Sequence, residues 1–186
     1  VYMVDRMIKL RNHPQSGFYL NEYEKLFEAL KQLENKGQKI LLIGVSFALL
    51  DFFEKYPMNL KNTIVMETGG MKGRRREMIR PELHAELSIG SGVAKIHSEY
   101  GMTELLSQAY SKGDGIFNCP PWMKIFVRDE EDPLLIKTPS SGKVPLSGAV
   151  NIIDLANIYS CSFVAADDAG KLHADGSFEI LGRMDG

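Results

Sequence analysis

Five consecutive residues near the middle of the chain combine the chemical groups that a nucleotide site needs. They are Tyr100, Gly101, Met102, Thr103 and Glu104. The aromatic ring offers a face to a base, and the glycine allows backbone to approach a ligand closely. The hydroxyl can donate a hydrogen bond to a phosphate, and the carboxylate can hold a divalent cation. We take this segment as a candidate nucleotide site; the alternative is a loop with a core tyrosine and a solvated glutamate.

A second unusual segment is Thr68-Gly69-Gly70. On its own it is typical of a simple turn. However, it follows an expected strand over residues 63–67, just as residues 99–104 follow an expected strand over 93–98. In open α/β sheets, ligands bind beyond the carboxyl ends of parallel strands. Both segments are therefore predicted to face the same pocket.

Other reactive side chains have weaker signals. The basic cluster over residues 72–76 could meet phosphates or an acidic carrier surface, but such a run is more often a solvated face. His97 could act as a base, although a core histidine is the commoner outcome. Neither Cys119 nor Cys161 has the cationic neighbours that activate a thiol. We expect Cys161 in the core and Cys119 at the surface.

The elements that must position these segments alternate between helix and strand over residues 1–118. Asn21 is a candidate helix cap and Gly37 a helix end, and Ser46 is a candidate cap for a second helix. Pro81 fits the first turn of a third helix, which runs to about residue 89. With strands over 39–44, 63–67 and 93–98, this pattern predicts an α/β fold with a parallel, helix-covered sheet.

Beyond Asn118 the pattern changes to short β-like runs, which predicts a β-rich part over residues 119–186. The expected strands cover 122–127, 134–137, 149–153 and 162–165. Residues 171–181 are expected to form a hairpin that turns at Asp175-Gly176. We place a subdomain boundary between residues 118 and 119.

Composition excludes several partners. The 186 residues include 24 acidic and 22 basic side chains, so no general electrostatic affinity for nucleic acid or anionic membranes is expected. The apolar runs are too short to span a bilayer. The two cysteines lack metal-ligand spacing and no signal peptide is visible, which favours a reduced, cytoplasmic setting.

Three segments together resemble signatures of the adenylate-forming superfamily, which includes acyl-CoA synthetases, luciferases and peptide-synthetase adenylation domains. The segment from Tyr100 to Glu104 resembles its Y-G-x-T-E motif. Asp167 falls where the family has T-G-D, with Ala165-Ala166 in place of the T-G pair. Gly182-Arg183-Met184-Asp185 resembles its G-R-x-D hinge.

Within that superfamily the chain is most similar to the LuxE-type acyl-protein synthetases. The similarity lies in Glu67-Thr-Gly-Gly-Met-Lys, Glu99-Tyr-Gly-Met-Thr-Glu-Leu-Leu-Ser-Gln-Ala-Tyr, Pro121-Trp-Met-Lys and Asn151-Ile-Ile-Asp-Leu-Ala-Asn. The resemblance implies ATP-dependent activation of a fatty acid or other small carboxylate, followed by acyl transfer to a protein thiol. Two alternatives are a phenylacetate-CoA-ligase-like enzyme, which uses coenzyme A as acceptor, and a non-catalytic nucleotide-binding or interaction module.

The resemblance also implies residue roles. Tyr100 would stack on adenine, and Thr103 and Glu104 would serve catalysis at the α-phosphate, with Glu104 holding Mg²⁺. Asp167 would accept hydrogen bonds from both ribose hydroxyls, and Arg183 would contact ribose or phosphate. The residues implied in ATP binding are Gly69, Gly70, Tyr100, Gly101, Thr103, Asp167 and Arg183.

Two family features are missing from the sequence. Nothing upstream of Tyr100 resembles the Ser/Thr/Gly-rich phosphate loop, and the mobile C-terminal subdomain with its catalytic lysine would follow Asp185. We therefore expect the chain to be the C-terminal half of the large domain of such an enzyme, inactive on its own.

Overall fold

A computed structural model describes residues 2–71, 73–138 and 145–184. Its helices are α1 (Tyr2–Arg11), α2 (Tyr23–Asn35), α3 (Ser46–Lys55), α4 (Arg80–Ser91) and the 3₁₀ turn η1 (Leu155–Asn157). Its strands are β1 (Ile40–Val45), β2 (Thr63–Thr68), β3 (His97–Tyr100), β4 (Ala109–Ser111), β5 (Phe117–Asn118), β6 (Met123–Arg128), β7 (Leu146–Asp154), β8 (Phe163–Leu172) and β9 (Phe178–Arg183).

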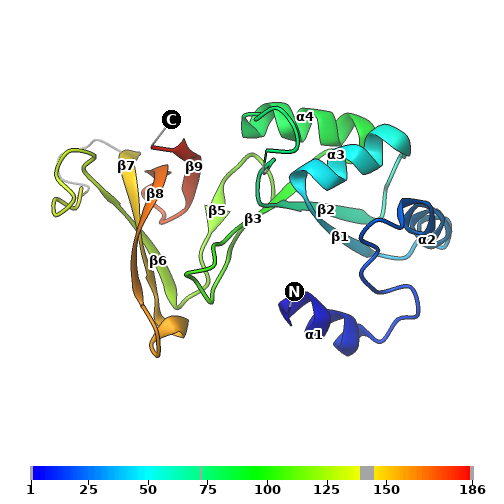
Figure 1. Cartoon of the computed structure of the whole chain (residues 1–186), viewed down its shortest axis with the longest axis horizontal. Helices are drawn as coiled ribbons and strands as arrows, with labels where there is room; N and C mark the ends of the chain where they lie inside the picture. The colour runs from blue at the N-terminus through cyan, green and yellow to red at the C-terminus, as the bar shows by residue number, and fades with distance from the viewer. Residues whose placement is uncertain (1, 72, 139–144, 185–186) are drawn as a thin grey trace.

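The first half of the chain is the expected parallel sheet with helices on it. Strands β1, β2 and β3 pair in parallel, and α3 and α4 lie over one face of them (Figure 1). Helix α1 contacts the opposite face, where the Tyr110 hydroxyl lies 3.5 Å from the sulfur of Met3. The carboxyl ends of β2 and β3 lie toward the second half of the molecule (Figure 1).

Glycine and proline end or begin the helices as expected. Helix α4 has Pro81 in its first turn, and it ends at Gly92, whose φ of 74° favours glycine. A Cβ at Gly92 would lie only 2.7 Å from the Cα of Asn59. The predicted side-chain caps were wrong. Asn21 does not cap α2, whose N-cap residue is Glu22. Ser46 does not cap α3 either, because it is the first residue of that helix and its hydroxyl binds another side chain.

The second half is antiparallel and continues the same sheet. The strand order is β1-β2-β3-β4-β5-β9-β8-β7-β6, and β5 joins β9 through the pair Phe117 and Phe178. The hairpin of β8 and β9 turns at residues 173–177, as predicted. The strand expected over 93–98 instead begins at His97. The strand expected over 134–137 is reduced to one bridge between Ile136 and Arg128.

Buried apolar side chains form two clusters. The first lies between α2, α3, α4 and the parallel strands, and includes Leu30, Phe52 and Leu87. The second lies within the antiparallel half and includes Phe117 and Phe178. Along the chain, Ile96 is the last buried member of the first cluster and Tyr100 is the first buried member of the second. The subdomain boundary between residues 118 and 119 stays a prediction.

Candidate functional site

The two segments that the sequence singled out lie side by side at the carboxyl ends of β2 and β3. The Cα register pairs Thr68 with Glu99, so Gly69 and Tyr100 follow at the next position. The Thr68 hydroxyl donates to the Glu99 carboxylate at 3.2 Å. Gly69 has a φ of 67°, so the chain turns away at once in a conformation that favours glycine.

Tyr100 is the last residue of β3 and is only 8% exposed. Its hydroxyl donates to the Asp168 carboxylate at 2.7 Å, and its ring meets Phe117 and Phe178 edge to face. Burial raises the pKa of Tyr100, and the hydrogen bond and charge of Asp168 raise it further, so the hydroxyl keeps its proton. The contact of Tyr100 with adenine stays a prediction.

The carboxylate that reaches Tyr100 is Asp168, which the sequence reasoning missed in favour of Asp167. Successive residues of a strand point to opposite faces, and β8 places Asp168 on the face of Ala166, a member of the second apolar cluster. The side chain of Asp167 is 63% exposed on the other face. The carboxylate next to Tyr100 is thus Asp168, and the ribose contact of Asp167 stays a prediction.

Arg183 lies close to Asp167 at the surface, and its contact with ribose or phosphate stays a prediction. Its Nη2 is 3.9 Å from Oδ2 of Asp167, and its side chain is 72% exposed. The Cα partner of Arg183 in the β8–β9 pairing is Asp168, the residue that follows Asp167, so the two strands run side by side here. The ion pair is solvent-exposed, so it adds little to stability and leaves the guanidinium accessible. Asp185 of the hinge motif lies outside the described residues.

The loop between β3 and β4 carries the other predicted residues. Gly101, Thr103 and Glu104 are exposed, whereas Leu105 next to them is buried. The described residues contain no group of three or more His, Cys, Asp or Glu side chains placed to hold a metal. Mg²⁺ bound with a nucleotide needs only one or two carboxylates in addition to phosphate oxygens. An exposed Glu104 fits that requirement.

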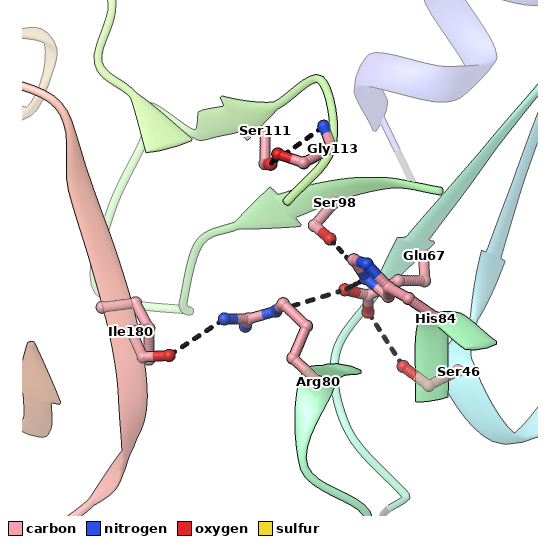
Figure 2. Close-up of polar contacts among 8 residues, drawn as sticks. All are labelled: Ser46, Glu67, Arg80, His84, Ser98, Ser111, Gly113 and Ile180. Atoms are coloured by element: carbon pink, nitrogen blue, oxygen red, sulfur yellow. Dashed lines mark hydrogen bonds and ion pairs between the residues drawn. The ribbon is translucent and has the colours of Figure 1, made fainter. Parts of the chain in front are cut away.

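A buried polar cluster that the sequence analysis did not predict lies behind these segments (Figure 2). Glu67 of β2 accepts a hydrogen bond from Ser46 at 2.9 Å and lies 3.5 Å from Nε2 of His84. The same nitrogen is 3.1 Å from the hydroxyl of Ser98. This is no Ser-His-acid triad, because the acid and the serine meet the same ring nitrogen and Ser98 is fully buried.

Arg80 connects this cluster to the antiparallel half. Its Nε lies 3.8 Å from Glu67, and its Nη1 donates to the carbonyl of Ile180 on β9 at 2.9 Å (Figure 2). Its guanidinium also sits 5.0 Å from the ring centre of Phe117, which packs on Tyr100. A single side chain on α4 thus contacts both halves of the sheet behind the candidate site.

Glu67 should make stability depend on pH. Burial alone would raise the pKa of Glu67, but hydrogen bonds from His84, Ser98 and Ser46 and the charge of Arg80 outweigh it and lower the pKa below its ordinary range. A lowered pKa in the folded state stabilises the fold above the unfolded-state pKa, and this contribution is lost as the pH falls through the folded-state pKa.

We therefore expect Glu67→Gln to flatten the acid side of the stability curve. Urea unfolding measured between about pH 5 and pH 3 should give a smaller loss of unfolding free energy for Glu67→Gln than for the wild type. Parallel curves for the two proteins would contradict the role of the Glu67 carboxylate.

The remaining candidates have structural contacts. In the basic cluster, Arg75 pairs with Asp51 and Glu54, Arg76 pairs with Glu82, and Arg74 lies over the ring of Phe47. Lys72 lies outside the described residues.

The two cysteines reverse our expectation, because Cys161 is exposed and Cys119 is half-buried. Burial raises the pKa of Cys119 to about 11, which makes it a poor nucleophile. No helix in the described ranges has the length and apolar character needed to cross a membrane.

Comparison with known proteins identifies the fold. No family model and no curated protein sequence matches the chain. ATP-bound MatB from Rhodopseudomonas palustris matches with a TM-score of 0.58 at 17% identity, over 87% of this chain and 33% of that chain. Coronafacic acid ligase from Pectobacterium brasiliense gives 0.57 at 15%, over 87% and 32%. The AMP complex of MenE, the O-succinylbenzoate coenzyme A synthetase of Bacillus subtilis, gives 0.52 at 16%, over 85% and 42%.

The mixed α/β fold of this chain is therefore shared with part of the MatB, coronafacic acid ligase and MenE structures. The resemblance based on three short motifs is therefore confirmed at the level of the fold. The chain spans about a third of the length of the MatB and coronafacic acid ligase structures. The activity and substrates of a complete protein accordingly belong to the proposal that follows.

Proposed function

We propose that this chain is the part of an ATP-dependent carboxylate-activating ligase that binds the adenine, ribose and metal-bound phosphate of ATP. The enzyme would be of the LuxE-type acyl-protein synthetase class and act on a fatty acid or other small carboxylate in the cytoplasm. The ATP-bound and AMP-bound structures among those of similar fold support the nucleotide. The segments that are similar to LuxE-type acyl-protein synthetases support that class of enzyme.

One observation carries the proposal. Tyr100 of the Y-G-x-T-E-like motif and Asp168 of the β8 strand are 68 residues apart in sequence, yet they share a 2.7 Å hydrogen bond. They meet where the parallel strands β2 and β3 end, and Gly69 lies beside them. That is the edge of an α/β sheet where ligands bind.

The proposed roles are those that the sequence predicted, with one change. Asp168 takes the ribose hydroxyls in place of Asp167, because a carboxylate next to the adenine slot is the natural acceptor for a vicinal diol. Gly69 and Gly70 flank the base, and the exposed Arg183 contacts ribose or phosphate. Glu104 would hold Mg²⁺, which supplies charge neutralisation at the phosphates when bound.

The proposed reaction joins a carboxylate oxygen of the acid to the α-phosphorus of ATP and releases pyrophosphate. A thiol then attacks the acyl carbon, and AMP leaves. Thr103 would donate its hydroxyl to an α-phosphate oxygen, so that the chain contributes positioning and charge stabilisation rather than a nucleophile. The half-buried Cys119, with its raised pKa, is a poor candidate for that thiol.

A second acceptor has one observation in its favour. MenE, which has the same fold, is a coenzyme A synthetase, so coenzyme A is the alternative to a protein thiol. Activity with an acid and coenzyme A, but with no protein acceptor, would favour that alternative.

A matched pair of aspartates tests nucleotide binding. AMP affinity would be measured by calorimetric titration of the chain and of the Asp168→Asn and Asp167→Asn variants. Because a hydrogen bond to a charged group contributes about 1.5–3 kcal/mol, Asp168→Asn should weaken AMP binding roughly tenfold or more. Asp167→Asn changes an exposed carboxylate on the adjacent residue and should stay within about twofold of the wild type.

Two results would overturn the proposal. No AMP or ATP binding by the wild-type chain would favour a non-nucleotide interaction module. A loss confined to Asp167→Asn would return the ribose role to that residue and remove the link between Tyr100 and the nucleotide.

A further inference from the structure

The loop that carries Thr103 and Glu104 is exposed on one side and firmly bound on the other. Both of these side chains are exposed, while Leu105 and Ser107 are buried. The buried side of the loop contacts the corner between β7 and β8, about 50 residues later in the sequence, through two polar side chains.

The first is Asp154, the last residue of β7, which is 0% exposed. Its Oδ2 accepts from the backbone amides of Leu106 at 2.9 Å and Ser107 at 2.8 Å. Its Oδ1 accepts from the Ser107 hydroxyl at 2.6 Å and from the amide of Ala156 at 3.1 Å. Four donors satisfy this buried carboxylate, which would otherwise be costly to desolvate.

The second is Asn157 of η1, which is also buried. Its Nδ2 donates to the carbonyl of Glu104 at 2.8 Å and to the carbonyl of Cys161 at 2.9 Å. Both hydrogens of the amide are thereby used. One of these hydrogen bonds therefore fixes the backbone carbonyl of Glu104, the residue whose side-chain carboxylate is exposed.

We propose that Asp154 and Asn157 are positioning residues that hold the segment 103–107 so that Thr103 and Glu104 face the phosphate and metal of the nucleotide. This inference rests on the proposed function. Their hydrogen bonds go to the backbone of the segment and to the Ser107 hydroxyl, so they act by fixing the geometry of the segment. Groups fixed before the ligand arrives need no reorganisation when charge develops, which is the condition for strong electrostatic stabilisation.

The chain supplies a matched control for a merely structural carboxylate. Glu34 of α2 accepts from the amides of Lys61 and Asn62 and from the hydroxyl of Thr63, at 2.6–3.1 Å. It thus holds a loop as Asp154 does, but at the start of β2, the end of the strand away from Gly69. Glu34→Gln should lower stability without affecting the nucleotide site.

A built-in probe reports the state of the anchored segment. Trp122 is the single tryptophan of the chain, and its indole N–H donates to the Ser107 hydroxyl at 2.9 Å. That hydroxyl in turn donates to Asp154. Tryptophan fluorescence of the folded protein should therefore change in Asp154→Asn and stay as in the wild type in Glu34→Gln.

The decisive experiment measures ATP affinity with and without Mg²⁺ for the wild type, Asp154→Asn and Glu34→Gln, together with their urea unfolding. Asp154→Asn should lose about tenfold or more of the Mg²⁺-dependent affinity while AMP binding changes less. Glu34→Gln should unfold at lower urea but bind both nucleotides as the wild type does. Asn157→Ala, which loses the hydrogen bonds to the carbonyls of Glu104 and Cys161, serves as the second variant if Asp154→Asn does not fold.

The outcomes separate the two proposals. No nucleotide binding by the wild type would overturn the proposed function. Nucleotide binding whose Mg²⁺ dependence survives in both Asp154→Asn and Asn157→Ala would overturn the positioning role alone. Equal affinity losses in Glu34→Gln and Asp154→Asn would also overturn it, because loss of stability alone would then explain both.

Discussion

Replacing Phe117 with alanine is expected to lower the free energy of unfolding by about 3–5 kcal/mol. Phe117 is 0% exposed and forms the single residue pair that joins β5 to β9. Its ring stacks on Phe178 at 5.5 Å, meets Tyr100 at 6.0 Å and lies under Arg80. Deleting it removes the transfer energy of a large side chain and leaves a cavity between these neighbours. Urea denaturation followed by circular dichroism measures the loss.

An exposed aromatic provides the control. Phe163 of β8 is 70% exposed, so Phe163→Ala should cost less than about 1 kcal/mol. Phe117→Ala should also weaken AMP binding, because Tyr100 loses the ring that supports it. A loss no larger than that of Phe163→Ala would show that the two halves of the sheet do not depend on this contact.

Local signals predicted the two ends of α4 and the turn of the hairpin, whereas α1 and the side-chain caps of α2 and α3 were not predicted correctly. Pro81 and Gly92 mark the ends of α4 because a missing amide and a positive φ are properties of those residues themselves. Asp175-Gly176 marks the hairpin turn for the same reason. The convergence of Gly69 and Tyr100 also followed from a general rule about parallel strands, so the position of the candidate site was predictable.

Elements made by long-range pairing were not predictable. Strands β4 and β5 contain only three and two residues, too few for a periodic pattern, and their existence depends on the neighbours β3 and β9. Ser46 has the sequence character of a helix cap. In the fold its hydroxyl instead satisfies buried Glu67, 21 residues away, and the sequence alone does not show that partner.

The sequence motif alone could not decide which of Asp167 and Asp168 lies next to Tyr100. The two carboxylates are adjacent, and alanines before and after them give no clear alternation to decide which one faces the core. The pairing of β8 with β9 also shifts in register between Ala169 and Gly170, which breaks any count made back from the hairpin turn. Only the pairing of the strands places Asp168 next to Tyr100.

The largest functional effect is expected for Glu104→Gln in the longer enzyme that the proposed function implies. The substitution keeps size and shape but removes the charge that would hold Mg²⁺ at the phosphates. Because Glu104 is exposed, folding should be unaffected. Losing one preorganised electrostatic contact to a developing charge typically costs about 10²–10³ in rate. Acid-dependent exchange of pyrophosphate into ATP, measured with a fatty acid, should therefore fall by about a hundredfold.

The exposed Glu130→Gln is the control, because it makes the same chemical change in the loop after β6, outside the motif segments. It should leave exchange within about twofold of the wild type. Raising the Mg²⁺ concentration should recover part of the Glu104→Gln rate if the missing contact is to the metal, and none of it if the carboxylate serves another purpose. Unchanged exchange in Glu104→Gln would remove the metal role, and with it the reason for an anchored loop behind Thr103 and Glu104.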